Sequence, residues 1–272
     1  MKADMKGQLI ITHPGGAHFD EILAISLILA VNTEAVFRIE RREPTLAELN
    51  NTDVWVIDIG GRYEPEKHNF DHHQDINCSA SFVLVAEYLE LLKTMSILPW
   101  WDFKDNVDRY GPVNGSMKYN AGDILVNQNP VEIWFTAIFA SEPEASLPLL
   151  KDFGNHIIKG ARRIKTQIDY WKTSSRLEIV GVPAMIGETR ESTGLEEFRR
   201  SDENPPDIVI SLDRRDDGWR LFRYDGTRVD FSLLSDCPEI AFAHKSGFMA
   251  KTKERLDMDA LIALVSKAVT NH

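Results

Sequence analysis

Cysteine and long apolar runs are both scarce in this sequence. Its 272 residues include two cysteines, Cys78 and Cys237, which lie far apart and form no CxxC pair. This spacing argues against a disulfide framework or a structural zinc knot and favours a reducing environment. The longest apolar stretch, Ile22 to Val31, is too short to span a bilayer, and no positively charged leader with an apolar core opens the chain. We therefore expect a cytoplasmic protein without a membrane anchor.

Positive charge is also in deficit. The chain has 31 Lys and Arg against 42 Asp and Glu, a formal net charge of −11. Such a surface repels polyanions, which argues against a protein that coats long DNA or RNA but leaves room for a local cationic cleft. With 43% hydrophobic residues, the chain is long enough for one large domain or two ordinary ones.

The first 60 residues alternate between strand-like and helix-like segments. Their apolar patterns predict strands at 8–12, 35–40 and 54–60, a buried helix at 20–32 and a short helix at 45–50. Thr45 and Glu48 have the spacing of a capping box at the start of that short helix. Alternation of this kind is typical of an α/β domain with a doubly wound, mainly parallel sheet.

The predicted secondary structure changes in kind near residues 172–176. Helical patterns dominate before this point, at 81–92, 100–110, 131–140 and 144–171. Beyond it, short strand-like runs are separated by Gly, Pro and Asp, and a helix is predicted at 259–269. We predict a larger domain over residues 1–172 and a smaller α+β domain over residues 173–272, with no internal repeat.

Imidazoles and carboxylates cluster where the predicted strands end. His13, His18 and Asp20 follow the first strand, and Asp58 ends the third one before two glycines. The stretch "HNFDHHQD" adds Asp71, His72 and His73, and "DFKDNVDRYG" adds Asp105 and Asp108. These side chains are common ligands of divalent metals, and the carboxyl ends of strands are where open α/β sheets hold their sites. If 71–73 were a strand, its two histidines would point to opposite sides, one toward a metal and the other toward a substrate.

Each cluster also has an ordinary explanation. Asp20 and Glu21 suit the positive end of a helix dipole, and a single Asp at a strand end is a common turn or cap former. The acids around Asp105 fit a solvated helix face, and His68 beside Lys67 fits the surface. Chance seldom arranges all these groups in this order, so we favour the joint metal site.

The motif series resembles that of the DHH phosphoesterase superfamily, which includes RecJ-type exonucleases and manganese-dependent pyrophosphatases. The stretches "THPGGAHFDE", "VIDIGGRYEPEKHNFDHHQ" and "DNVD" are most similar to the branch named for melanocyte proliferating gene one. The resemblance covers about the first 110 residues, and "IAFAHKSGFMA" resembles a C-terminal segment of the same branch. Two departures are Phe19, where a Cys is expected, and "DRYG" in place of Asp-Asn-Gly.

The resemblance implies a two-metal site and a role for each matching residue. The implied metal ligands are His13, His18, Asp20, Asp58, His72 and either Asp105 or Asp108, with Asp58 bridging both ions. His73 would face the scissile phosphate, and Asp71 would fix the tautomer of a neighbouring imidazole. The donor set of nitrogen and oxygen without thiolate suits two Mn²⁺ ions, with Mg²⁺, Co²⁺ and Zn²⁺ as alternatives.

The segment "AHKSGFMAKTKER" is the clearest basic stretch of the acidic chain, and we predict that it helps to bind substrate through His244, Lys245 and Gly247. A solvated loop is the alternative. The favoured function is a metal-dependent phosphodiesterase or exonuclease that acts on short RNA or DNA. The alternatives are a hydrolase of a small phosphate compound, such as a dinucleotide, nucleotide phosphate or pyrophosphate, and a non-catalytic metal- or nucleotide-sensing module. The oligomeric state stays open, a homo-oligomer included.

Overall fold

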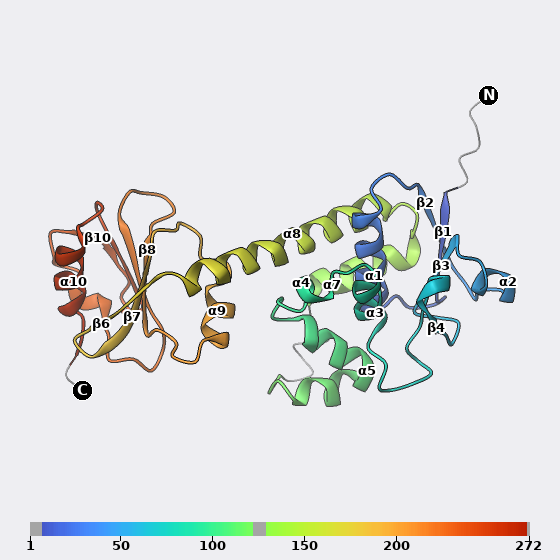
Figure 1. Ribbon diagram of the computed structural model, residues 1–272, viewed down its shortest axis with the longest axis horizontal. Helices are drawn as coiled ribbons and strands as arrows, with labels where there is room; N and C mark the ends of the chain where they lie inside the picture. Colours follow the sequence, from blue (N-terminus) through green and yellow to red (C-terminus); the bar gives the residue numbers. More distant parts are fainter. Residues whose placement is uncertain (1–6, 122–128, 271–272) are drawn as a thin grey trace, which may run out of the picture. The chain divides into compact units, whose positions relative to one another are not determined.

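The computed structural model describes residues 7–121 and 129–270, and it divides the chain into two compact units (Figure 1). The first unit comprises Met1–Arg162 and the second Arg163–His272. The division falls inside the long helix α8 (Leu147–Lys172). The boundary predicted from the sequence lies ten residues later, at the end of this helix. Each unit has a sheet of its own and is described separately below.

A five-stranded sheet forms the centre of the first unit, with the strand order β2-β1-β3-β5-β4. The strands are β1 (Gln8–Thr12), β2 (Phe37–Arg41), β3 (Val54–Ile57), β4 (Tyr63–Glu64) and β5 (Asn69–Phe70). All neighbouring pairs are parallel except β4 with β5. This confirms the predicted mainly parallel sheet. The short strands β4 and β5 have no apolar run long enough to predict them.

Several helices of the first unit contact its sheet. The helices described in this unit are α1 (Phe19–Val31), α2 (Leu46–Leu49), α3 (Ser81–Tyr88), α4 (Leu92–Met95), α5 (Trp101–Met117) and α7 (Pro130–Ser141), with the 3-10 turn η1 (Pro65–Lys67). Because α1 packs against α3, α5, α7 and β3, every residue from Asp20 to Ala30 is buried. This explains why the helix is apolar almost all round.

Apolar side chains cover both faces of the first sheet. Leu9, Val54 and Val56 pack in one cluster with Leu49 of α2. Trp55, the strand neighbour of these valines, points to the other face, where its ring meets the edge of Tyr88 from α3 at 5.8 Å. Burial of both faces accounts for the continuous apolar runs of the strands.

The second unit has a six-stranded sheet in the order β10-β11-β9-β8-β7-β6. Its elements are β6 (Ser175–Ile179), β7 (Val182–Gly187), α9 (Leu195–Ser201), β8 (Ile208–Leu212), β9 (Trp219–Arg223), η2 (Phe231–Leu234), β10 (Ile240–Ala243), β11 (Met249–Thr252) and α10 (Met258–Ser266). Only β7 and β8 pair in parallel among these neighbours. The mixed α+β character is as predicted, whereas α9 has no counterpart in the sequence-based expectation.

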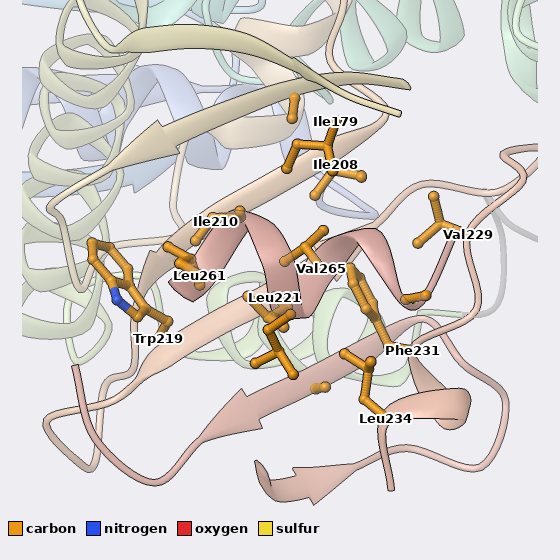
Figure 2. Close-up of a cluster of buried hydrophobic side chains, with 14 of the residues drawn as sticks. Ile179, Ile208, Ile210, Trp219, Leu221, Val229, Phe231, Leu234, Leu261 and Val265 are labelled. Carbon is orange, nitrogen blue, oxygen red and sulfur yellow. The ribbon is translucent and has the colours of Figure 1, made fainter. Parts of the chain in front are cut away.

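One continuous hydrophobic core holds the second unit together. Leu261 and Val265 of α10 pack toward the sheet side chains, among them Ile210 and Leu221 (Figure 2). Phe231 of η2 is fully buried in the same cluster. Burial of a side chain of this size contributes about 1.5–3 kcal/mol, so α10 and η2 together fix one face of the sheet.

Candidate metal centre

The predicted ligands meet at the carboxyl edge of the first sheet. His13 follows β1, Asp58 follows β3, and Asp71 and His72 follow β5. These strands are parallel neighbours, so their carboxyl ends reach the same edge. The N-terminus of α1 adds Asp20 beside them. The sheet topology thus gathers motifs that lie far apart in the sequence.

Asp58 lies at the centre of this cluster. Its side chain is 1% exposed, and one oxygen, Oδ1, accepts a hydrogen bond from Ser81 Oγ at 3.0 Å. Oδ2 lies 3.6 Å from His13 Nε2, and Oδ1 lies 3.4 Å from His72 Nε2. The Asp58 backbone has a positive φ of 60°, held by its N–H donating to Phe70 O at 2.9 Å. Aspartate tolerates this left-handed conformation better than most residues, so the turn after β3 accommodates an acid at this position.

Three overlapping groups of side chains could each hold a metal ion. They are His13 with His18 and Asp58, then Asp58 with His72 and His73, and finally Asp20 with His72 and Asp108. Within each group the ligand atoms lie within 4.8 Å of one another. Asp58 and His72 each belong to two groups, so the clusters form one continuous centre.

Unpaired buried oxygen atoms show that this donor set fits a cation. Both carboxylate oxygens of Asp20, together with Asp58 Oδ2 and Asp108 Oδ2, are buried without a hydrogen bond of normal geometry from the described residues. Burial, reinforced by the charges of Asp58 and Asp108, raises the pKa of Asp20 well above its usual value. Buried carboxylates require a compensating partner, and a divalent cation between these oxygens would supply it.

The two innermost histidines hold protons strongly in the metal-free protein. The Glu21 carboxylate, 3.2 Å from His13 Nε2, raises the pKa of His13 to about 9. Burial opposes the charged form of His72, but its contacts to Asp108 and Asp58 outweigh burial and raise its pKa to about 10. Protons therefore occupy, in part, the positions that a cation would take.

Asp71 positions His73 rather than facing the cluster. Its Oδ1 lies 2.7 Å from His73 Nδ1 and accepts the His73 backbone N–H at 3.1 Å, while Oδ2 accepts the Gly61 N–H at 2.6 Å. Burial alone would raise the pKa of Asp71, but these hydrogen bonds hold it below its usual range. The His73 side chain is 58% exposed, so its ring is available to a ligand from solvent.

The prediction that His72 and His73 point to opposite sides is wrong. The strand β5 ends at Phe70, and both histidines lie in the following turn. Their ring centroids are 4.5 Å apart, and both rings lie near Asp58. The two differ in exposure instead, because the His72 side chain is 8% exposed.

The structure separates Asp105 from Asp108. Asp105 Oδ1 accepts the Ala80 N–H at 2.8 Å at the start of α3, and its Oδ2 pairs with Arg109 at 3.2 Å. Asp108 Oδ2 instead lies 3.0 Å from His72 Nε2. Of the two candidates, Asp108 is in the metal-binding groups and Asp105 joins α5 to α3.

Glu21 has a larger part in the cluster than helix-dipole reasoning suggests. This fully buried acid accepts hydrogen bonds from Thr12 Oγ1, from the His18 backbone N–H at 2.9 Å and from Arg41 at 3.1 Å. It therefore neutralises Arg41 and orients the imidazole of His13. The signal for it in the sequence is its position three residues after His18, the spacing of a helix N-cap and N3 residue.

Residues 244–247 of the second unit form a tight turn between β10 and β11. His244 Nδ1 lies 2.7 Å from Ser246 Oγ, and Gly247 donates its N–H to His244 O at 2.9 Å. A Cβ atom at Gly247, where φ is +69°, would lie 2.0 Å from Asp230 Oδ1, so the glycine is explained by packing. Lys245 is exposed. The neighbouring Lys251 pairs with Asp213 at 2.7 Å, within the same unit.

A comparison with known families bears on the segment that carries most of these ligands. Residues 9–81 match the family model MYG1_exonuc, an uncharacterised protein family (UPF0160). The MYG1 exonuclease of Mus musculus is 42% identical over 64 residues, which cover 23% of this chain and 16% of the mouse protein. The MYG1 protein of Chlamydia trachomatis is 34% identical over 89 residues, 32% of this chain and 29% of that protein. The resemblance inferred from the motifs is thus confirmed for this segment, which spans less than a third of each relative.

A solved structure with an overall likeness is the pGpG-specific phosphodiesterase PggH from Vibrio cholerae. It is 12% identical, and the alignment covers 96% of this chain and 99% of that one with a TM-score of 0.33. At this TM-score no function is drawn from the likeness. Among the described residues, no helix is long and apolar enough to cross a membrane.

Proposed function

We propose that this protein is a metal-dependent phosphoester hydrolase, a phosphodiesterase or exonuclease that acts on short RNA or DNA. The observation that carries the proposal is the buried group of Asp20, Asp58 and Asp108. Both oxygens of Asp20 lack a hydrogen bond from the described residues, and Asp58 Oδ2 and Asp108 Oδ2 have only imidazole contacts, at 3.6 Å from His13 and 3.0 Å from His72. Such a group is costly without a cation and suited to two of them. The match of residues 9–81 to the MYG1_exonuc family supports the same reading.

Each ligand has a proposed place around two Mn²⁺ ions. His13 and His18 would hold one ion, Asp20 and Asp108 the other, and Asp58 would bridge them with His72 alongside. Two bound cations of this kind polarise a phosphoryl oxygen and lower the pKa of water. The absence of thiolate from the donor set favours Mn²⁺, and Mg²⁺, Co²⁺ or Zn²⁺ are the alternatives to compare in the assay.

Protein groups around the ions would position the substrate. Asp71 holds His73 by a 2.7 Å contact, leaving the rest of the ring exposed to donate a hydrogen bond to a phosphate oxygen. Within the second unit, the exposed Lys245 stays a sequence-based prediction of a substrate contact. The net charge of −11 favours short or small substrates over long nucleic acid, so a dinucleotide or nucleotide phosphate is the second candidate class.

Asp58→Asn tests the proposal. The substitution keeps the shape and the acceptor for Ser81 but removes the charge that would bridge two cations, so Mn²⁺-dependent hydrolysis of short RNA, short DNA and dinucleotides should fall by several orders of magnitude. Asp102→Asn, an exposed acid on α5, is the matched control and should retain wild-type turnover. Near wild-type turnover by purified Asp58→Asn, or an inactive wild-type enzyme on every substrate of the panel, contradicts the proposal.

A further inference from the structure

A cavity of about 360 Å³ lies directly beside the metal centre in the first unit. His18, Asp20 and Asp108 form part of its wall, so a molecule in this cavity would lie next to the candidate metal ligands. Ile133 of α7 and the buried Phe82 of α3 supply apolar surface. The volume is within the range of pockets that bind small molecules, about 300–1,000 Å³.

Phe19 is the aromatic side chain that links this cavity to the metal centre. It stands between His18 and Asp20. The side chain is half-buried and also lines a neighbouring apolar cavity of about 620 Å³. Lys104 Nζ lies 4.9 Å from the centroid of its ring. The ring is thus presented to two cavities rather than enclosed in the core.

Fixed polar groups lie along the same cavity. Lys104 Nζ pairs with Glu132 Oε2 at 2.5 Å, and the side chains of both are less than a fifth exposed. Asn129, the N-cap of α7, lies on the same wall. A lipid chain could not form hydrogen bonds with these polar side chains. Inorganic phosphate could not cover the apolar side chains of the cavity. A flat heterocycle with apolar faces and a polar rim matches both.

We propose that this cavity binds the nucleobase of a nucleotide substrate, with Phe19 as the stacking surface and the Lys104–Glu132 pair at the polar rim of the base. The inference rests on the proposed function for the position of the phosphate, which would lie at the metal centre. It goes further by assigning the base to a specific pocket. Phe19 is then a specificity-determining residue.

Hydrolysis of paired substrates tests the assignment. A dinucleotide is compared with the same compound lacking the base at the position nearest the scissile phosphate. Stacking of a base on an aromatic side chain is worth about 1–3 kcal/mol, or about 5- to 150-fold. Phe19→Ala should therefore lower kcat/KM for the dinucleotide by a factor in this range and leave the abasic compound unchanged. An equal loss for both compounds overturns the inference.

Two further variants show whether the loss of activity in Phe19→Ala comes from the cavity or from damage to the metal centre. Phe19→Leu keeps the apolar volume and removes the ring, and it should give the same selective loss. Ile133→Trp fills the cavity from an exposed position on α7 and should exclude the base. The matched control is Phe103→Ala, which removes an aromatic side chain of α5 that lines neither cavity. Bound Mn²⁺ is measured for each variant and should not change.

Equilibrium binding separates the inference from the proposed function. Adenosine and uridine 5′-monophosphate are compared with ribose 5-phosphate on the Mn²⁺-loaded protein by calorimetry. A preference of about 5- to 150-fold for at least one base-bearing ligand, lost in Phe19→Ala and Ile133→Trp, supports the pocket even if no substrate is hydrolysed. Binding without any preference for the base overturns the pocket, even if hydrolysis is observed.

Discussion

The two units of this protein treat buried polar groups in opposite ways. In the first unit, Asp20, Asp58 and Asp108 all have buried oxygens without a hydrogen bond from the described residues. In the second, the buried Asp213 is paired with Lys251 at 2.7 and 2.9 Å, and Glu239 is the one acid of the described residues with a similar orphan oxygen. The unpaired carboxylate oxygens of the second unit are therefore isolated, whereas those of the first unit lie together, where a cation could compensate them.

The two units should therefore differ in how strongly their stability depends on a bound metal. The second unit has a continuous apolar core that joins helix, sheet and the turn η2. The first unit buries carboxylates next to one another, and burial together with the charges of Asp58 and Asp108 raises the pKa of Asp20. A ligand that binds only the folded state stabilises it by mass action, so the first unit should gain stability from metal and the second should not.

The largest expected effect is the pH dependence of metal binding. The raised pKa values of His13, about 9, and His72, about 10, mean that both imidazoles carry a proton at neutral pH in the metal-free protein. A metal must displace these protons, so affinity rises with pH and levels off above the higher pKa. Two displaced protons give about a 100-fold change in Kd per pH unit between pH 6 and 8.

Calorimetric titration of Mn²⁺ in buffers with different ionisation enthalpies measures the number of protons released. In the metal-free protein, these histidines contribute most to the free energy of unfolding at low pH. This is the opposite of the pH dependence of metal affinity. The histidine contribution is fully present below the unfolded pKa of about 6.5 and is lost as pH rises through 9–10. A metal affinity that is constant from pH 6 to 8 would show that the two histidines are not ligands.

The second prediction separates His72 from His73. His72 is buried and touches both Asp58 and Asp108, so His72→Ala should weaken Mn²⁺ binding by at least about 100-fold. His73 is exposed and held by Asp71, so His73→Ala should change affinity by less than about 10-fold while turnover is lost. Metal content after dialysis and turnover are measured for both, with the exposed His156→Ala as the control. Equal loss of metal in both variants would disprove this division of roles.

The third prediction concerns the two acids of α5. Asp108→Ala should weaken Mn²⁺ binding by about 10- to 100-fold, because it removes an oxygen next to His72. Asp105→Ala should leave metal affinity near wild type but lower the free energy of unfolding by about 1–3 kcal/mol, because the Ala80 N–H loses its acceptor. Urea denaturation and metal titration of each variant provide the comparison. The reverse pattern would make Asp105 the ligand.

The smallest expected effect is a gain in stability. Asp20→Asn removes a buried charge that Asp58 and Asp108 disfavour, so the metal-free variant should melt at a higher temperature than the wild type at pH 7, by about 2–4 °C for each kcal/mol gained. With Mn²⁺ added, the order should reverse, because the wild type alone retains the full ligand set. Melting curves in chelator and in Mn²⁺ measure both. A variant that melts lower in chelator would contradict the proposed repulsion.

The sequence predicts which candidate ligands lie together better than it predicts how they are oriented. His13 and Asp58 follow apolar runs, and the rule that parallel strands end at one edge is enough to bring them together. His72 was placed with them by its Asp-His-His motif and not by an apolar run. Asp105 and Asp108 are three residues apart on one helix and so share a face, which is why periodicity alone could not choose between them. The choice depends on the long-range contact of Asp105 with Ala80.

Other features were out of reach for similar reasons. The strand β5 has two residues, too few to leave a pattern, so the turn that brings both rings of His72 and His73 to Asp58 could not be foreseen. Glu21 was assigned to the helix dipole because its partner Arg41 comes from another strand. Such contacts depend on the register of β1 with β2 and not on local sequence.

The backbone of Asp58 makes this position a marker of evolutionary history. A left-handed conformation with φ of 60° is easier for glycine or asparagine than for most residues, and the buried charge adds to the cost. Selection for stability alone would therefore favour replacing Asp58, since both substitutions remove the buried charge. Where aspartate is kept at this position, we expect that metal binding compensates the unfavourable free energy of the buried charge. We therefore expect a relative with asparagine or glycine at this position to have lost Mn²⁺-dependent turnover, whatever the rest of its sequence retains.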